Sequence, residues 1–557
     1  MFPITDPRQR LDFMHIQLHG RRAALASCRT ATLLSFVVLL ACAGSSTASS
    51  GTLATPSPMT AVDMRPTVDA RELVPRLYGG QSTLLWLAEG PERARLALRL
   101  LRKAPEHGLD PGRYGVDSLE RRLENLHDLA LAEEFDRALS TAMLQYLADI
   151  HFGRVASAYR QPAGADSRFD PVAQLRQALD EGGLEEAVEA AAPAIPLYGR
   201  VKSVLAHYRA LARAAQAWAA LPSPGRNPVR PGEPYDGAAL LRERLRLLGD
   251  LGADEPEADD GIYTPALSSA VRRFQARHGL LEDGLLGSGT LAALSVPVSR
   301  RVAQLALTLE RLRWVPPPSS GRVVAVNVPT YRLWAFDARD NFSTPALEMR
   351  VIVGTAARTQ TPLFIGRMRY LEFNPYWNVP PSIQAGEIVP KLARNPAYLQ
   401  QNDMEVVGAD GRVLDLAPSA ALAALRSGGA RVRQRPGARN VLGEVKFAMP
   451  NPMNIYLHST SSKELFKRSR RDLSHGCIRV EQPAELAQFV LDDPQRWGAA
   501  SVAAAMSDGK NRTVSLRQPV PVVLFYATAL ADHHGRALFA QDIYGRDQAL
   551  IARLGLQ

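Results

Sequence analysis

The chain has 557 residues, which is more than a single hydrophobic core accommodates, so about three or four folded units are expected. Hydrophobic residues make up 46% and charged residues 22% of the sequence, which is typical of globular proteins and excludes wholesale disorder. The formal net charge of +10 at pH 7 suits an anionic partner, but the basic residues are spread along the chain without a nucleic-acid-binding motif, so no nucleic acid partner is expected.

The N-terminal segment predicts export. An apolar run, residues 31–43, follows several arginines and precedes small polar residues. This is the layout of a signal peptide, and the run is shorter than a membrane-spanning helix requires, so residues 1–44 are expected to be a leader. Ala41 and Ala43 fit ordinary cleavage, whereas the run that ends at Cys42 resembles a lipoprotein box, which would tether the N-terminus to a membrane. Both routes stay open, as does an uncleaved anchor.

The cysteine content directs attention to Cys477. Cys28 and Cys42 lie within the expected leader, so Cys477 is alone in the mature chain and has no disulfide partner. An unpaired thiol in an oxidising compartment is a liability unless its reactivity is used. The sequence therefore favours a functional thiol at this position.

Two helical units are expected after the leader. Residues 45–70 are rich in Ser, Thr, Ala and Pro, which is typical of a flexible linker. Apolar residues then recur at helical spacing, which predicts an all-α scaffold over residues 71–220. Five prolines mark a second linker over residues 221–235. Residues 236–296 form the second helical unit, a small domain of three helices.

From residue 321 the pattern changes to period two. Val324 and Val326 alternate with Val323, and a turn separates this run from the next, which predicts a β-hairpin. Residues 383–428 interrupt the β-rich runs with helical segments, and so long an excursion is expected to be an insertion that acts as a lid. The predicted fold class is multidomain α+β, with a mainly-β C-terminal domain over residues 321–550. Its further β-rich runs are residues 331–336, 347–353, 366–373, 446–449, 454–458 and 520–527.

The sequence Ser474-His475-Gly476-Cys477 is the sharpest chemical feature, and His458 ends a β-rich run upstream of it. A thiol is only slightly ionised at neutral pH, so a nucleophilic cysteine needs a nearby base, and an imidazole can serve. Antiparallel pairing of the run that His458 ends with the run that Cys477 begins would bring the two together. The N–H groups of His475, Gly476 and Cys477 would then converge on one oxyanion.

Two other interpretations of these residues remain open. His458 as a core histidine and Gly476 as a plain turn glycine would carry no chemistry. Histidine and cysteine are also metal-ligand types, but His475 and Cys477 lack the usual ligand spacing and no fourth candidate lies nearby, so no metal is expected.

Together, His458 and the motif that runs from Ser474 to Arg479 resemble the signature of L,D-transpeptidases with a YkuD-type catalytic domain. The resemblance covers most of the mature chain, in the manner of the large multidomain branch of that family. Residues 236–296 resemble its small peptidoglycan-binding domain, although a structural spacer remains open, and residues 73–155 resemble its helical scaffold domain. The resemblance also rests on these segments: Gly354 with Thr361-Pro362, Asn374 to Pro380, Phe466 to Arg471, and Asp542 to Asp547.

The resemblance implies a role for each residue of the motif. Cys477 attacks the substrate, and His458 is the base, which the backbone at Ser459 orients. Backbone groups around Ser474, His475 and Gly476 line the oxyanion hole. No metal and no organic cofactor is implied. Substrate contacts are expected from five further residues: Arg479, Tyr376, Trp377, Asn378 and Arg471.

The implied substrate is the peptidoglycan stem peptide, in the periplasm or elsewhere in the cell envelope. A tetrapeptide stem acylates Cys477 as a thioester, and the side-chain amine of a second stem accepts the acyl group, which forms a 3→3 cross-link. The residues do not distinguish this acceptor from water, which would make the protein an L,D-carboxypeptidase, or from a protein to be anchored to the wall. A non-catalytic peptidoglycan-binding scaffold is the alternative from another class.

Overall fold

The computed structural model describes residues 68–80, 84–156, 169–213, 218–252, 261–316 and 320–556. The expected leader, with Cys42, and nearly all of the first linker lie outside these ranges. Within them, no helix combines the length and the apolar character that crossing a membrane requires. All described residues belong to one compact unit, Thr60–Gln557.

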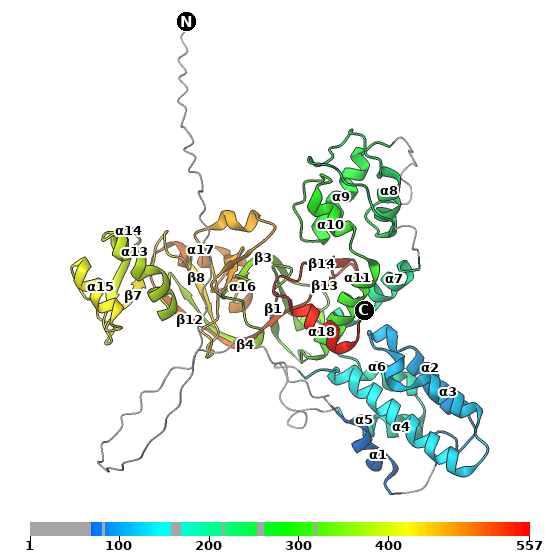
Figure 1. Ribbon diagram of the computed structural model, residues 1–557. Coiled ribbons are helices and arrows are strands. Elements are labelled where there is room, and N and C mark those ends of the chain that lie inside the picture. The colour runs from blue at the N-terminus through cyan, green and yellow to red at the C-terminus, as the bar shows by residue number, and fades with distance from the viewer. Residues whose placement is uncertain are drawn as a thin grey trace, which may run out of the picture. The chain divides into compact units, whose positions relative to one another are not determined.

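The N-terminal part is helical, as predicted (Figure 1). The longest helix, α4, begins at an Asp128 cap whose carboxylate accepts the N–H of Leu131 at 2.8 Å. Helices α1 to α6 share one hydrophobic core, whereas α7 packs its apolar side against α11 and the C-terminal hairpin. The elements are α1 (Ala70–Tyr78), α2 (Glu92–Arg102), η1 (Ala104–His107), η2 (Pro111–Tyr114), α3 (Val116–Glu124), α4 (Leu129–Phe152), α5 (Pro171–Glu181), α6 (Leu184–Ala191) and α7 (Pro196–Leu211).

The second helical unit contains α8 (Ala238–Leu247), α9 (Pro265–Arg277) and α10 (Ser288–Leu294). Its core contains a stripe of apolar side chains on α9: Leu267, Val271 and Phe274. Gly284 has a left-handed backbone with φ +69°, and a Cβ there would lie 2.7 Å from Ser268 Oγ, so the turn after α9 requires a glycine. Helix α11 (Val298–Arg313) then leads into the β domain.

The strands of the C-terminal domain close into a barrel, because β2 pairs with β1 on one side and with β3 on the other. The nine strands run in the order β10-β3-β11-β9-β8-β4-β12-β1-β2, and all but β10 belong to the closed ring. The strands are β1 (Arg322–Asn327), β2 (Arg332–Asp337), β3 (Leu347–Gly354), β4 (Phe364–Phe373), β8 (Val445–Ala448), β9 (Leu457–His458), β10 (Asp472–Ser474), β11 (Ile478–Val480) and β12 (Arg512–Phe525).

The predicted alternation sets the two faces of the barrel wall. Val324 and Val326 on β1 are fully buried in the main core, against which α16 (Pro483–Leu491) and α17 (Ala499–Ser507) also pack. Val323 belongs to a second, separate apolar cluster, because neighbouring residues on a strand point to opposite faces. The barrel thus has an apolar surface on both sides of β1. Together with the helical units, it confirms the multidomain α+β class.

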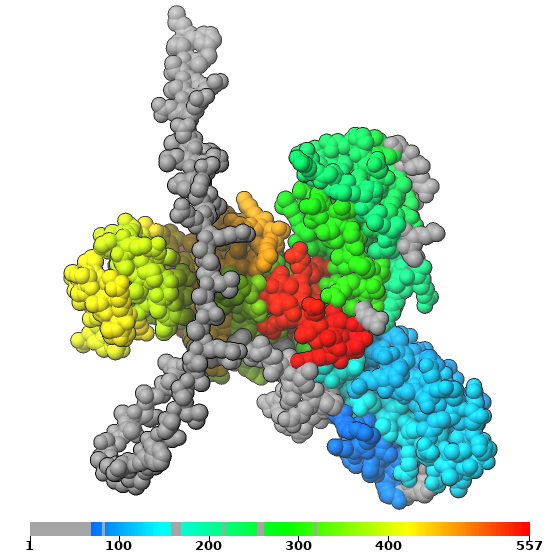
Figure 2. Space-filling model, in the orientation of Figure 1, coloured from blue at the N-terminus to red at the C-terminus, as the bar shows by residue number. Residues whose placement is uncertain are grey.

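The insertion is a small α/β unit, not purely helical as expected. Its sheet, in the order β5-β7-β6, was not predicted, and its own core includes Trp377 and Val432. In Figures 1 and 2 it forms a distinct yellow lobe. The elements are β5 (Trp377–Asn378), α12 (Pro381–Ile383), the π-helical turn η5 (Gln384–Ile388), α13 (Val389–Arg394), α14 (Tyr398–Gln401), β6 (Met404–Val407), α15 (Pro418–Arg426) and β7 (Arg431–Gln434).

The C-terminal segment packs back on α11. It contains β13 (Ala529–Ala531), β14 (Ala537–Phe539) and α18 (Arg546–Leu554), and the remaining short helices are η4 (Ala338–Asp340) and η6 (Lys463–Lys467). Arg311 on α11 forms a buried ion pair of 2.6 Å with Asp547, and Thr308 Oγ1 donates to the carbonyl of Ala529 at 2.6 Å.

A buried carboxylate on α11 joins this helix to the helical N-terminal part. Glu310 accepts the N–H groups of Arg154 at 2.6 Å and Val155 at 3.0 Å, and it pairs with the guanidinium of Arg313 at 2.9 Å. Arg313 also donates to the hydroxyl of Tyr198 on α7 at 2.9 Å. One carboxylate therefore satisfies donors from two distant segments of the chain.

Replacing Glu310 with alanine should destabilise the fold strongly, because the buried guanidinium of Arg313 loses its carboxylate and the N–H groups of Arg154 and Val155 lose their acceptor. Loss of one member of a buried ion pair costs about 3–5 kcal/mol of unfolding free energy. Urea unfolding followed by circular dichroism measures the change. Glu89→Ala is the matched control, since Glu89 is 85% exposed and pairs only loosely with Arg93. Equal stability of the two variants would contradict a structural role for Glu310.

Candidate active site

The two segments of the sequence motif lie side by side in the barrel, but in parallel. Strands β9 and β11 pair parallel, with Arg479 opposite His458 and Ile478 opposite Leu457. The expectation of antiparallel pairing was therefore wrong. The connection from β9 to β11, residues 459–477, is long enough for the chain to return in the same direction, as parallel strands require.

The imidazole of His458 is held by the backbone. His458 is only 4% exposed, and its Nδ1 lies 2.5 Å from the carbonyl oxygen of Ser459. A carbonyl only accepts, so Nδ1 carries the proton and Nε2 is left with its lone pair. Burial, followed by the positive charge of Arg479, lowers the pKa of His458 to about 3, so the ring is neutral at physiological pH.

The hydroxyl of Ser459 has a separate partner. It donates to the carboxylate of Glu444, which also binds Lys463 Nζ at 3.3 Å. This contact fixes the backbone at Ser459, whose carbonyl accepts the hydrogen bond from Nδ1 of His458. Sequence reasoning missed Glu444, because nothing in its immediate sequence distinguishes it from an exposed glutamate.

Cys477 is half-buried at the start of β11, and its Sγ lies 3.6 Å from the carbonyl oxygen of Asn454. Burial raises the pKa of the Cys477 thiol, while hydrogen bonds with Tyr456 and the charges of Lys446 and Arg479 act in the opposite direction. At rest Cys477 is thus a thiol and His458 a neutral imidazole, on two strands that pair with each other. The environment of both groups disfavours charge.

Tyr456 is a site residue that the sequence analysis missed. Burial and the neighbouring Cys477 raise the pKa of its hydroxyl, and its ring centroid lies 5.7 Å from that of His458. Lys446 Nζ lies 5.0 Å from the centre of the same ring. The signal was present, because Tyr456 precedes His458 by two residues and side chains two apart along an extended chain share a face.

The turn before Cys477 is closed by Ser474. The N–H of Gly476 donates to Ser474 Oγ at 3.1 Å, and Ser474 Oγ donates to the carbonyl of Cys477 at 2.6 Å. Gly476 has φ +113°, a conformation that side chains strain. The expected convergence of three N–H groups on one oxyanion is thus wrong for Gly476. Within the described ranges the N–H of Cys477 has no acceptor, so it remains available.

Three residues from distant segments that resemble the family, Gly354, Thr361 and Tyr544, contact one another and this turn. Thr361 Oγ1 donates to the carbonyl of Gly476 at 2.8 Å and accepts the N–H of Gly354 at 2.9 Å. Tyr544 donates its hydroxyl to the carbonyl of Gly354 at 2.6 Å and accepts the N–H of Thr361 at 3.1 Å. A Cβ on Gly354 would lie 1.9 Å from the carbonyl oxygen of Thr359, so this close packing requires glycine.

Arg479 is placed to meet an anion, whereas Arg471 is not. The Nε of Arg479 is buried and has no hydrogen-bond partner in the described part of the chain, and burial lowers the pKa of its guanidinium. Arg471 instead donates to the carbonyls of Val351, Arg468 and Tyr331. The expected substrate contact of Arg471 is therefore replaced by a structural one, which its charge in the sequence did not reveal.

The aromatic residues Tyr376 and Trp377, which precede the insertion in the sequence, make most of their contacts with it. Trp377 is only 9% exposed and packs in the core of that unit, and the guanidinium of Arg433 lies 4.3 Å from the centre of the Tyr376 ring. Asn378 is exposed on β5. Of the three expected substrate contacts, Trp377 is thus engaged in packing, while Asn378 is free to meet a ligand.

His475 connects the catalytic turn to the insertion. Its Nε2 lies 2.6 Å from Glu387 Oε1 in the π-helical turn η5, and Lys391 Nζ lies 3.3 Å from the other carboxylate oxygen. Burial acts to raise the pKa of Glu387, but the contacts with His475 and Lys391 outweigh it and hold this pKa below its usual value. His475 therefore points toward the insertion.

Comparisons with known proteins agree with this arrangement. Residues 321–520 match the family model of the L,D-transpeptidase catalytic domain, residues 72–205 match the scaffold domain, and residues 235–294 match the peptidoglycan binding domain. The chain thus carries these three domains, which confirms the resemblance seen in the sequence.

Two curated relatives and two solved structures are similar to parts of the chain. A Haemophilus influenzae protein assigned as an L,D-transpeptidase is 33% identical over 258 residues, which cover 46% of this chain and 51% of that protein. A zinc D-Ala-D-Ala carboxypeptidase of Streptomyces albus G is 38% identical over 58 residues, 10% of this chain and 23% of that protein. The chain thus spans at most about half the length of these relatives.

The solved structures are L,D-transpeptidases. That of Xylanimonas cellulosilytica is 17% identical, covers 55% of this chain and 100% of its own, and has a TM-score of 0.17. That of Stackebrandtia nassauensis is 13% identical, covers 54% of this chain and 97% of its own, and has a TM-score of 0.23.

The pH dependence of Cys477 alkylation tests the uncharged resting state. Because burial raises the pKa of the thiol, the rate of reaction with iodoacetamide should rise about tenfold per pH unit through pH 8, in proportion to the thiolate fraction. Tyr456→Phe removes a hydroxyl that stabilises the thiolate, so its profile should move to higher pH. Cys477→Ser supplies the blank. A rate that is already constant below pH 7 would show a stable thiolate and contradict this account.

Proposed function

We propose that this protein, which carries an L,D-transpeptidase catalytic domain over residues 321–520, cross-links peptidoglycan stem peptides through a thioester on Cys477. The observation that supports it most directly is the backbone-fixed neutral imidazole of His458 on the strand that pairs with β11, next to Cys477. The peptidoglycan binding domain at residues 235–294 suits the same substrate. The reaction would then take place in the cell envelope, outside the cytoplasmic membrane.

Acylation begins with transfer of the thiol proton from Cys477 to Nε2 of His458. The sulfur attacks the carbonyl of the third stem residue, and the oxygen of the tetrahedral intermediate is met by the N–H of Cys477. As the peptide bond to the terminal D-amino acid breaks, the imidazolium of His458 protonates the departing amine. The product is a thioester and a free amino acid.

The low pKa of His458 favours the second half of acylation, in which the departing amine is protonated. Burial and the charge of Arg479 disfavour the protonated ring, which makes it costly for His458 to take the thiol proton but lets it pass that proton readily to the leaving amine. The hydroxyl of Tyr456 lowers the cost of the preceding thiolate. In the second stage a side-chain amine of another stem attacks the thioester, gives up a proton to His458, and releases the thiol. This stage forms the 3→3 cross-link.

Arg479 supplies positive charge beside the reacting atoms. Its buried Nε lacks a partner in the described ranges, and a carboxylate of the stem peptide would satisfy it. The same charge acts to lower the pKa values of His458 and Cys477. We assign Arg479 the binding of a stem carboxylate, together with electrostatic support of the thiolate.

Substitution of the two reacting residues tests the proposed reaction. Cys477→Ala should abolish cross-linking while the melting temperature stays unchanged, and His458→Ala should lower turnover about a hundredfold or more, because a positioned base contributes that much. Mass spectrometry of muropeptides after incubation with tetrapeptide-containing peptidoglycan gives the products.

Each product pattern has a distinct meaning. Tripeptides without cross-links would show that the protein is an L,D-carboxypeptidase that uses water as the acceptor. Unchanged muropeptides after incubation with the wild-type protein would indicate a non-catalytic wall-binding scaffold. A fall of less than threefold in His458→Ala would contradict its role as the base and point to His475.

We further propose that the insertion acts as a cap over the catalytic turn. The contact between His475 and Glu387 supports this, because it joins the residue two before the nucleophile to the π-helical turn of the insertion. The side chains remain 51% and 38% exposed, so the pair adds little stability and can open. π-Helical turns also occur often at functional sites. The cap would order polymeric stems before acylation.

The variant Glu387→Ala tests the cap. It should leave labelling of Cys477 by a small electrophile within about twofold of wild type, but reduce cross-linking of intact peptidoglycan about tenfold, which is a loss of about 1.4 kcal/mol in transition-state binding. Asp410→Ala is the matched control, since Asp410 is an exposed residue of the insertion that pairs only with Arg412. Replacing residues 383–428 by a Gly-Ser linker is less selective, because it strips the core around Trp377 and Val432. Unchanged cross-linking by Glu387→Ala would refute the cap.

A further inference from the structure

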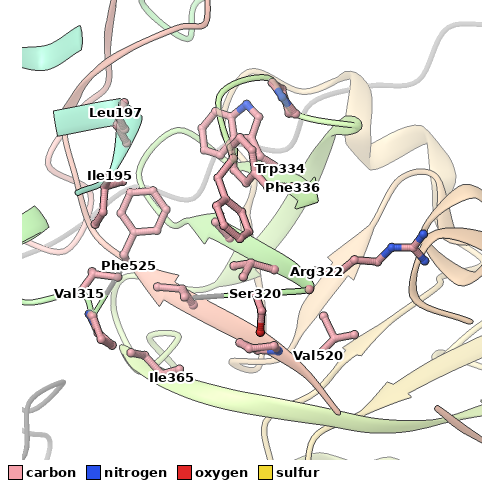
Figure 3. A pocket seen from close by; sticks show the side chains of 18 of the residues that line it. Ile195, Leu197, Val315, Ser320, Arg322, Trp334, Phe336, Ile365, Val520 and Phe525 are labelled. Atoms are coloured by element: carbon pink, nitrogen blue, oxygen red, sulfur yellow. The ribbon is translucent and has the colours of Figure 1, made fainter. Parts of the chain in front are cut away.

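A cavity of about 770 Å³ lies on the outer face of the barrel, away from the catalytic turn. Its walls come from the start of α7, from the end of α11, and from the outward faces of β1, β2, β4 and β12 (Figure 3). Its lining includes neither Cys477, His458 nor Tyr456. Nothing in the proposed cross-linking reaction uses it.

The outer face of the barrel, which forms one wall of the cavity, is apolar. Trp334 and Phe336 on β2 and Phe525 on β12 point outward into it, while their strand neighbours Leu333 and Leu524 fill the barrel core (Figure 3). An outward face of an antiparallel pair is normally polar when water covers it. Helix α7 and hairpin β13–β14 cover part of this face but leave the cavity between them and the wall.

One arginine at the cavity forms no ion pair within the described ranges. Arg200 on α7 lines it, and its Nε is buried without a hydrogen-bond partner in the described part of the chain. One Nη of Arg200 donates to the carbonyl of Ser343 at 3.1 Å. Burial lowers the pKa of its guanidinium, although the charge of Asp532 acts in the opposite direction. A buried, unsatisfied cationic donor is costly, which makes it a group that an anion would stabilise.

The carboxylates that line the cavity do not supply this anion, because each already pairs with another arginine. Glu348 pairs with Arg332, Asp492 with Arg322 at 2.6 Å, and Asp532 with Arg536 at 2.8 Å. Arg200 forms no ion pair within the described ranges. Of the arginines that line the cavity, Arg322 and Arg517 are paired with carboxylates, whereas Arg200 and the exposed Arg367 form no ion pair within the described ranges.

We propose that this cavity binds an amphiphile with one aliphatic tail and one anionic head group, with the head on Arg200. A site of this volume that is mainly apolar and has a few placed polar groups is typical of small-molecule binding. The aromatic and aliphatic wall takes the tail, and the guanidinium takes a carboxylate or a phosphate. A stem peptide does not fit, because its amide and charged groups would have too few partners along Trp334, Phe336 and Phe525.

Calorimetric titration of the full chain with n-alkyl phosphates and n-alkyl carboxylates tests the proposal. Affinity should rise about threefold to fourfold for each added methylene, because each buries a CH₂ group, and should level off when the tail fills the cavity. Arg200→Gln should weaken binding about tenfold through loss of a charged hydrogen bond. Arg99→Gln, at an exposed position on α2, makes the same change in charge outside the cavity and should bind as wild type does.

Ala325→Phe is the second variant, because Ala325 lies on the cavity wall and a larger side chain fills the space. It should abolish binding while alkylation of Cys477 continues. Vesicles of phosphatidylcholine with and without phosphatidylglycerol distinguish the source: competition by the anionic vesicles alone identifies a membrane lipid, and its absence identifies a free amphiphile. No saturable binding, no dependence on tail length, or equal binding by Arg200→Gln and wild type would each overturn the proposal.

Discussion

The parallel pairing of β9 with β11 is the constraint on which the catalytic turn depends. It sets Arg479 opposite His458, so a guanidinium and an imidazole occupy neighbouring positions of one buried sheet. It also brings Cys477 beside the strand that carries Tyr456 and His458. A shift of this register by one residue would turn each of these side chains to the other face, so the chemistry depends on the pairing as much as on the residues.

Burial then decides the charge state of the site. It disfavours both the thiolate of Cys477 and the imidazolium of His458, and the nearby charges of Arg479 and Lys446 favour the thiolate but oppose the imidazolium. Cys477 and His458 are therefore both uncharged at rest, although positive charges lie near them. The hydrogen bond from Nδ1 to the carbonyl of Ser459 keeps the ring oriented meanwhile, without adding a charge.

The sequence predicted those parts of the protein that depend on local pattern. The helical units, the period-two hairpin of β1 and β2, and the residues of the motif follow from spacing and residue type. The direction of β9 relative to β11 did not, because parallel and antiparallel strands have the same period. Sheet β5-β7-β6 was missed because its strands are two to four residues long, too short for a periodic signal. The role of Arg471 depends on three carbonyls that are distant in sequence.

Closure of the barrel explains why the rest of the site is built from loops. Strand β11, which follows Cys477, pairs with β9 on one side and with β3 on the other, so it offers no free edge to which a peptide could add as a further strand. Recognition must then come from side chains and loops at the end of the barrel where Cys477 lies. Gly476 and the insertion meet this need, since the turn presents the nucleophile and Glu387 brings a separate folded unit to His475. The apolar outer wall, with Arg200 beside it, lies elsewhere on the same barrel, so a ligand there would act on the protein without competing for the nucleophile.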